Sequence, residues 1–180
     1  MASLFLPTVF KEKLIPGFWV GLVFSMYSIA VVIVSPFIGT VVSKVGFRNL
    51  IAIGLVTMGV SIIPIGFLLE IENDYWTLFV GILLRALQGT ASASINTTCY
   101  SLAANKYADR TEFIVGMLEG MSGCGLVLGL LGGSAVYEGM GYKAVFVFFG
   151  SLLPILAVVS WFMFRCIEER ERKEAEAQER

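Results

Sequence analysis

The stretch NLIAIGLVTMGVSIIPIGFLL, residues 49–69, decides the fold of this chain, because it holds 21 residues in a row without a charge. About 20 residues of α-helix, each rising about 1.5 Å, cross a hydrocarbon core that is about 30 Å thick. Lipid offers no hydrogen-bond partner to a peptide group, so a segment inside the bilayer must pair its own backbone groups. An α-helix does this within one segment. The stretch therefore predicts a transmembrane helix.

Four more long apolar runs flank this one. Two of them contain no charged residue, and the other two contain one each, Arg85 and Glu119. The runs are apolar on all sides, unlike helices that lie on a membrane surface, and they lack the alternation of membrane strands. The sequence therefore predicts an all-α membrane protein, a partial bundle of five transmembrane helices. We place them at about 18–42, 50–69, 76–104, 113–136 and 144–165.

The composition argues against most other classes of protein. Hydrophobic residues make up 57% of the 180 residues and charged residues only 15%, against roughly 45–50% and about 25% in a soluble domain. There is no His, and the three Cys are scattered, so the residues for a zinc site, a disulfide framework or a Ser-His-Asp catalytic set are lacking. We therefore expect no enzyme activity, no cofactor, no metal and no nucleic-acid partner.

The basic residues predict how the chain is oriented. Nine Lys and Arg lie in the loops and tail at one end of the predicted helices, and three lie at the other end. The end with nine is expected to be cytoplasmic. Residues 1–17 then form an extracytoplasmic segment, 18–166 the five-helix bundle, and 167–180 a charged cytoplasmic tail or the start of a linker.

The first residues predict that a helix is missing in front of this chain. Residues 1–7 have no basic flank and no apolar run long enough for a signal peptide, so they look like the outer end of a preceding helix. We therefore expect a fragment, or one half that pairs with another. The protein is expected to be an integral, multi-pass protein of the plasma membrane or of an organelle.

A basic turn separates the first two predicted helices. It reads Gly39-Thr-Val-Val-Ser43-Lys44-Val-Gly46-Phe-Arg48. The preference for positive charge on the cytoplasmic side would produce a tight basic turn here on its own. By itself, the pattern therefore does not identify a function.

Two further patterns lie inside predicted helices. Arg85-Ala-Leu-Gln88-Gly89 puts a charge at membrane depth, which costs several kcal/mol unless the charge is paired or hydrated. We therefore expect Arg85 to face protein or water. The fourth predicted helix carries glycines, three of them spaced by four residues, and such a ridge lets two helices approach closely. These glycines are Gly116, Gly125, Gly129 and Gly133.

Together, the three patterns resemble the signatures of the major facilitator superfamily of secondary transporters. The turn is similar to that family's loop between its second and third helices, the Arg85 pattern to its fourth-helix motif, and the glycines to its fifth-helix antiporter motif. The style is closest to the vesicular amine transporter and drug:proton antiporter branches. Two residues depart from the family pattern: Ser43 stands where Asp is usual, and Leu130 where Pro is usual.

The resemblance implies a fold and a set of roles. The chain would hold helices two to six of a twelve-helix transporter, whose two halves rock about a solute site at the membrane midplane. A second half, missing or separate, is then an expected partner. The residues of the turn would form a gating loop, in which Ser43 replaces the Asp that helps to latch the gate. The four glycines would seal the path against leaks.

Polar side chains within the predicted helices are candidates for a solute or proton path. With no His in the chain, the Glu at membrane depth is the one conventional proton carrier. The polar residues that share a helical face with Arg85 either contact a solute or hold neighbouring helices together, and the pattern favours neither interpretation. The candidates are Arg85, Gln88, Ser92, Asn96, Glu119 and Tyr27.

Two functions are consistent with these patterns. The first is transport of a small organic solute by alternating access, of which proton-coupled antiport is one form. The second is a non-transporting membrane scaffold or regulatory protein derived from a transporter half, since the changes at Ser43 and Leu130 are those that relaxed constraint would leave. Neutralising Arg85 or Glu119 separates the two, because only a transporter would lose uptake.

Overall fold

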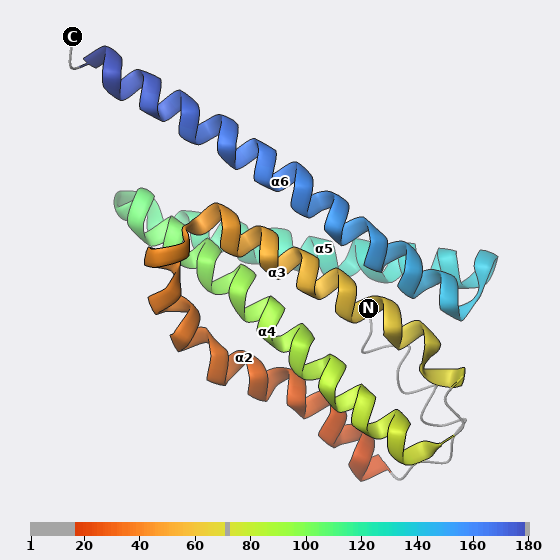
Figure 1. The fold of residues 1–180 in the computed structure, drawn as a ribbon. Helices are drawn as coiled ribbons and strands as arrows, with labels where there is room; N and C mark the ends of the chain where they lie inside the picture. Colours follow the sequence, from red (N-terminus) through yellow and green to blue (C-terminus); the bar gives the residue numbers. More distant parts are fainter. Residues whose placement is uncertain (1–16, 71–72, 179–180) are drawn as a thin grey trace.

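The computed structural model describes residues 17–70 and 73–178, and all of its regular elements are helices. Five are long and apolar enough to cross a membrane, which confirms the predicted all-α, five-helix architecture (Figure 1). Residues 1–16, where we expected the end of a preceding helix, lie outside the described residues. The elements are α2 (Gly17–Val45), α3 (Phe47–Ile62), the 3₁₀ helix η1 (Ile63–Glu70), α4 (Asp74–Lys106), η2 (Ala108–Arg110), α5 (Thr111–Met140) and α6 (Tyr142–Gln178).

The helices extend beyond the apolar runs that predicted them. Helix α6 continues to Gln178 and so includes most of the segment expected to be a charged tail. The turns between helices are correspondingly short. Gly46 alone joins α2 to α3 and Gly141 alone joins α5 to α6. Both have positive φ angles, 85° and 82°, a conformation that glycine adopts without the steric penalty other residues incur.

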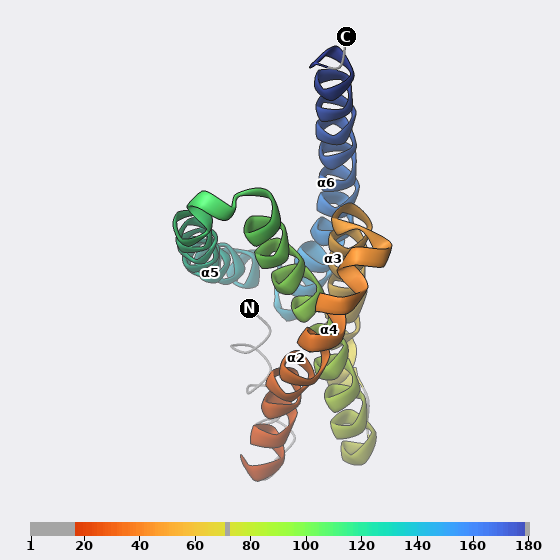
Figure 2. The ribbon, with the colours of Figure 1, turned by 90° about the vertical axis from the view of Figure 1, so that its left-hand side faces the viewer.

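Four of the five helices form a row, and α4 lies inside it. Helix α4 packs against α2 on one side and α3 on the other, and α3 packs in turn against α6 (Figure 1). Helix α5 stands apart from this row, as Figure 2 shows, and contacts α4 and α6 only sparsely. The row therefore contains most of the packing between helices.

Glycines set the close approaches within the row. A Cβ on Gly89 of α4 would lie 2.4 Å from the Tyr27 carbonyl oxygen of α2, and one on Gly54 of α3 would lie 2.8 Å from Ile95 Cγ1 of α4. A Cβ on Gly59 of α3 would lie 2.7 Å from the carbonyl oxygen of Gly150 in α6. Helices pack this closely in lipid because small residues let their backbones come together and gain van der Waals contact.

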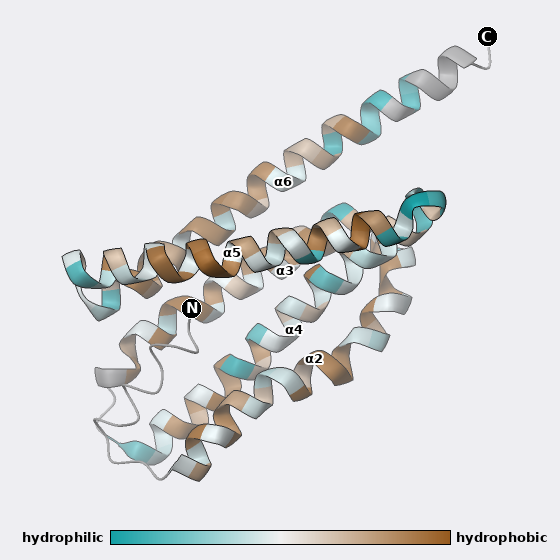
Figure 3. Cartoon of the chain, turned by 180° about the vertical axis from the view of Figure 1, so that it is seen from behind, coloured by the Kyte–Doolittle hydropathy of each residue, from teal (hydrophilic) through white to brown (hydrophobic). Residues whose placement is uncertain are grey.

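The apolar core lies towards one end of the bundle. It is formed by Val23, Ile65, Leu68, Leu84, Val145 and Phe146, which come from α2, η1, α4 and α6. Many large apolar side chains elsewhere are exposed. On α5 the hydrophobic residues gather along the middle of the helix and hydrophilic ones at the turn before it (Figure 3). This outward apolar surface is what a protein in contact with lipid presents.

We expect Gly59→Ala to lower the stability of the fold. The new methyl group would lie 2.6 Å from Pro154 Cδ and 2.7 Å from the Gly150 carbonyl oxygen, so α3 and α6 must separate, at an expected cost of about 1–3 kcal/mol. The measurement is the midpoint of thermal unfolding in detergent, followed by size-exclusion chromatography. Gly120→Ala on α5 is the matched control, because its Cβ would meet no atom within 4 Å. Equal midpoints for the two variants would contradict the close packing of α3 and α6.

Candidate functional site

Arg85 is buried between α2 and α4. Its side chain is 6% exposed, and its guanidinium lies 4.8 Å from the centre of the Phe24 ring on α2. Its Nη1 donates a hydrogen bond of 3.3 Å to Oε1 of Gln88, one turn along α4. The charge therefore faces protein, as the cost of exposing it to lipid requires.

Several donors of this buried pair have no partner among the described residues. They are Nε and Nη2 of Arg85 and Nε2 of Gln88, whose residue is 2% exposed. A buried donor that makes no hydrogen bond costs about 1–3 kcal/mol, and more when it is charged. The pair is therefore a site with unused hydrogen-bonding capacity inside the protein, not a saturated structural contact.

The next turn of α4 carries a second polar group, centred on Ser92. The Ser92 hydroxyl oxygen accepts a hydrogen bond of 2.8 Å from the Tyr27 hydroxyl of α2 and one of 3.3 Å from Nδ2 of Asn96. Ser92 is buried and Asn96 is exposed. On this polar face of α4, Tyr27 and Ser92 therefore link two helices, whereas Asn96 lies at an accessible surface.

Glu119 belongs to a different part of the structure from Arg85. It lies exposed on α5, and its Oε1 accepts a hydrogen bond from the hydroxyl group of Tyr100 on α4. The two charges at membrane depth are therefore not paired with each other. Tyr100 was absent from the residues selected in the sequence, although it continues the spacing of four residues that joins Gln88, Ser92 and Asn96.

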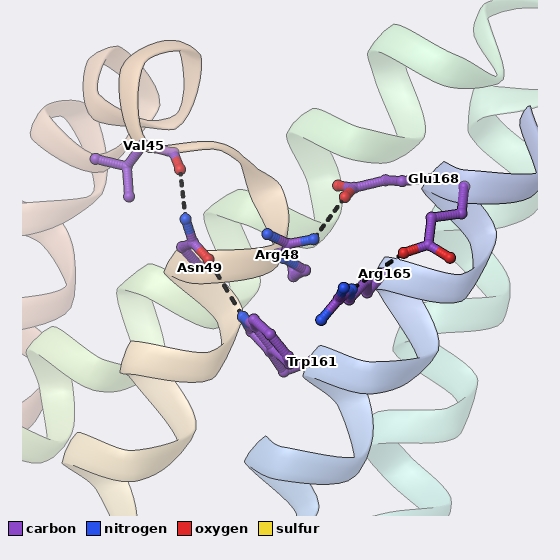
Figure 4. Close-up of polar contacts among 7 residues, drawn as sticks. Val45, Arg48, Asn49, Trp161, Arg165 and Glu168 are labelled. Atoms are coloured by element: carbon purple, nitrogen blue, oxygen red, sulfur yellow. Dashed lines mark hydrogen bonds and ion pairs between the residues drawn. The ribbon is translucent and has the colours of Figure 1, made fainter. Parts of the chain in front are cut away.

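The basic turn between α2 and α3 is fastened to α6. Arg48 Nη1 lies 2.8 Å from Glu168 Oε2, and the Arg48 guanidinium lies 4.9 Å from the centre of the Trp161 ring. Trp161 Nε1 donates a hydrogen bond of 3.4 Å to Oδ1 of Asn49, whose Nδ2 donates one of 3.2 Å to the carbonyl oxygen of Val45 (Figure 4). These contacts hold the end of α2, the start of α3 and α6 together.

The other residues of the predicted gating loop make no such side-chain bond. Gly39, Lys44 and Gly46 are exposed. Ser43, also exposed, donates a hydrogen bond of 3.0 Å to the carbonyl oxygen of Thr40 in its own helix. Among these five residues, Arg48 is thus the one that joins the turn to another helix through its side chain.

Two glycines of the antiporter-like pattern are packed less closely than those of the row. A Cβ on Gly116 or Gly125 would meet no atom within 4 Å. Gly129 is partly exposed, and Gly133 is the buried residue of α5. The sequence pattern found these glycines on α5, but missed the close approaches at Gly54, Gly59, Gly89 and Gly150. Those four glycines lie on three different helices, α3, α4 and α6, so no spacing along a single helix reveals them.

Comparisons with known proteins are consistent with this picture. The family model described as Major Facilitator Superfamily matches residues 1–180. Human MFS-type transporter SLC18B1 is 21% identical over 159 residues, which cover 88% of this chain and 35% of that protein. The human synaptic vesicular amine transporter is 27% identical over 161 residues, 88% of this chain and 30% of that protein. The human chromaffin granule amine transporter is 29% identical over 150 residues, 82% and 26% respectively.

The matched region is a limited part of these relatives. The chain spans between about a quarter and just over a third of their length, from 26% to 35%. No solved structure was found to match the chain.

A double-mutant cycle tests the link between α2 and α4. We expect Tyr27→Phe and Ser92→Ala each to destabilise the protein, with a coupling of about 0.6 kcal/mol between them, the average for hydrogen bonds between membrane helices. Unfolding free energies in detergent provide the measurement. Ser25→Ala with Ser92→Ala is the control pair, because Ser25 donates to the Gly21 carbonyl oxygen of its own helix. Strict additivity for the first pair would argue against the bond.

Proposed function

Because this chain belongs to the major facilitator superfamily, we propose that it forms part of a transporter that moves a small organic solute across a membrane by alternating access. Proteins of this kind use two bundles that rock about a site near the membrane midplane. The chain corresponds in length to about a third of its relatives. In this proposal it supplies one wall of the solute path, and a second half supplies the other.

The observation that carries the proposal is the buried Arg85–Gln88 pair. An Arg at the centre of a membrane helix costs about 2.5–3.5 kcal/mol even in insertion measurements. A structural role alone would favour a guanidinium whose donors are all satisfied, but Nε and Nη2 of Arg85 have no partner among the described residues. Unused donors beside the Tyr27–Ser92 link support a site that acts on a solute.

Helix α5 supports the need for a second half. The described part of the chain leaves most of it uncovered, including Gly116 and Gly125, next to which there is open space. Exposed glycines on a membrane helix let another helix approach closely. In the proposal, α5 therefore lies against the other half, where its glycines help to close the path against leaks.

Proton coupling is assigned to the pair of Tyr100 and Glu119. Glu119 is a carboxyl group at membrane depth that is exposed in the described chain, and its hydrogen bond from Tyr100 joins α4 to α5. A relative shift of these two helices would change what the carboxyl group contacts. Glu119 would then bind a proton on one side of the membrane and release it on the other, as intramembrane carboxyl groups do in proton-coupled transport.

Uptake into proteoliposomes that contain the full-length protein tests the proposed solute site. We expect Arg85→Gln to reduce uptake by about tenfold or more, a loss of about 1.4 kcal/mol or more of transition-state stabilisation, because the guanidinium is part of the site. Radiolabelled serotonin and succinate are used as an amine and a carboxylate. Arg165→Gln is the control, since that Arg pairs with Glu169 at the surface of α6. No uptake by the wild-type protein of either solute, with or without a pH gradient, would favour the scaffold alternative.

A second prediction concerns Glu119. We expect Glu119→Gln to abolish the part of uptake that depends on an imposed pH gradient, because the amide cannot carry a proton. Exchange of labelled for unlabelled solute without a gradient should persist, since the solute site is elsewhere. Glu112→Gln, an acidic residue in the first turn of α5, is the matched control. Gradient-driven uptake that survives in Glu119→Gln would remove Glu119 from the proton path.

A further inference from the structure

The unpartnered groups of the Arg85–Gln88 pair are all hydrogen-bond donors. They are Arg85 Nε, Arg85 Nη2 and Gln88 Nε2. The side-chain acceptor of the pair, Gln88 Oε1, is already used by Arg85 Nη1 at 3.3 Å. A ligand of this pair must therefore offer acceptors.

The positive charge of Arg85 also lacks a counter-charge among the described residues. The group seen beside it is aromatic: the centre of the Phe24 ring lies 4.8 Å from the guanidinium carbon. The other charge at membrane depth, Glu119, is bonded to Tyr100 on α5. Water can accept hydrogen bonds from the unused donors, but it does not neutralise the guanidinium. An intramembrane cation is normally paired with an anion or with backbone carbonyl groups.

We propose that Arg85 and Gln88 bind a carboxylate group. The two free Arg85 nitrogens, Nε and Nη2, form one edge of the planar guanidinium, and this edge matches the two oxygens of a carboxylate. Gln88 Nε2 supplies a third donor. The inference rests on the proposed function, which makes the pair part of a solute site, and it goes further by naming the chemistry that the site takes.

The carboxylate can come from two sources. It is a group of the transported solute, or it is an Asp or Glu side chain of the protein outside the described residues. Both sources use the same three donors and neutralise the same charge. The two sources differ in whether an added small carboxylate raises the midpoint of thermal unfolding, which is therefore the quantity to measure.

The test is thermal unfolding of the purified full-length protein in a concentration series of sodium succinate, with ionic strength held constant by sodium chloride and with butylamine as the cationic comparison. A ligand that binds the folded state raises the midpoint by mass action. If the carboxylate is a solute, succinate raises the midpoint of the wild type and of Arg165→Gln by about 2 °C or more. In Arg85→Gln the rise is lost, and in Gln88→Leu succinate binds about tenfold more weakly. Gln88→Leu keeps the charge and therefore serves if Arg85→Gln does not fold.

If the carboxylate belongs to the protein, succinate has no effect and Arg85→Gln lowers the midpoint, because a carboxylate is left without its partner. Changing one Asp or Glu outside the described residues to its amide then restores the midpoint in the Arg85→Gln background. Two results would overturn the inference. In the first, succinate has no effect and the midpoint of Arg85→Gln is at or above that of the wild type. In the second, the midpoint of Arg85→Gln is lowered, but none of these amide substitutions restores it. Neither result depends on uptake. If the protein transports an amine and also gives one of these two results, the carboxylate site is rejected and the proposed transport function is not.

Discussion

The absence of water inside a bilayer is the constraint on which the rest of this structure depends. Every polar group at membrane depth must find its partner in protein, because lipid provides none. The backbone meets this requirement by forming helices throughout the apolar runs. Side chains meet it one at a time: Ser25, Ser35 and Ser61 each donate to a carbonyl oxygen one turn back in their own helix. Against that background, five buried side-chain atoms of the described residues lack a partner, and three of them belong to Arg85 and Gln88; the others are Arg48 Nε and Thr98 Oγ1.

Lipid also removes the usual reason for helices to associate, since apolar side chains gain little by leaving it. Close backbone contact takes the place of the hydrophobic effect, and this explains why Gly54, Gly59 and Gly89 lie where the helices of the row meet. Helix α5 has glycines of its own but no close partner in the described chain. The four helices of the row therefore pack against one another, whereas the surface of α5 is left for contact with lipid or another protein segment.

The polar contacts fall into three groups with different physical characters. The Arg48–Glu168 pair and Trp161 lie beside the start of α3, where the charges are partly solvated and such pairs add little stability. They position the turn between α2 and α3. Tyr27 and Ser92 join two helices with a single neutral bond. Arg85 differs from both, since it combines burial, charge and free donors in one place, and this combination is the basis of the proposed solute site.

The sequence by itself determined the five helices, because hydrocarbon thickness and backbone pairing act on each segment separately, and its motifs indicated the family to which the chain belongs. It also identified Arg85 as a residue that could not face lipid. Tertiary structure alone decided that Phe24 and Tyr27 lie against that face of α4, that Glu119 bonds to Tyr100, and that Arg48 reaches Glu168. Such pairings depend on how helices rotate and cross, which is set by the fit between two surfaces, and the periodicity of one helix carries no information about the surface of its neighbour.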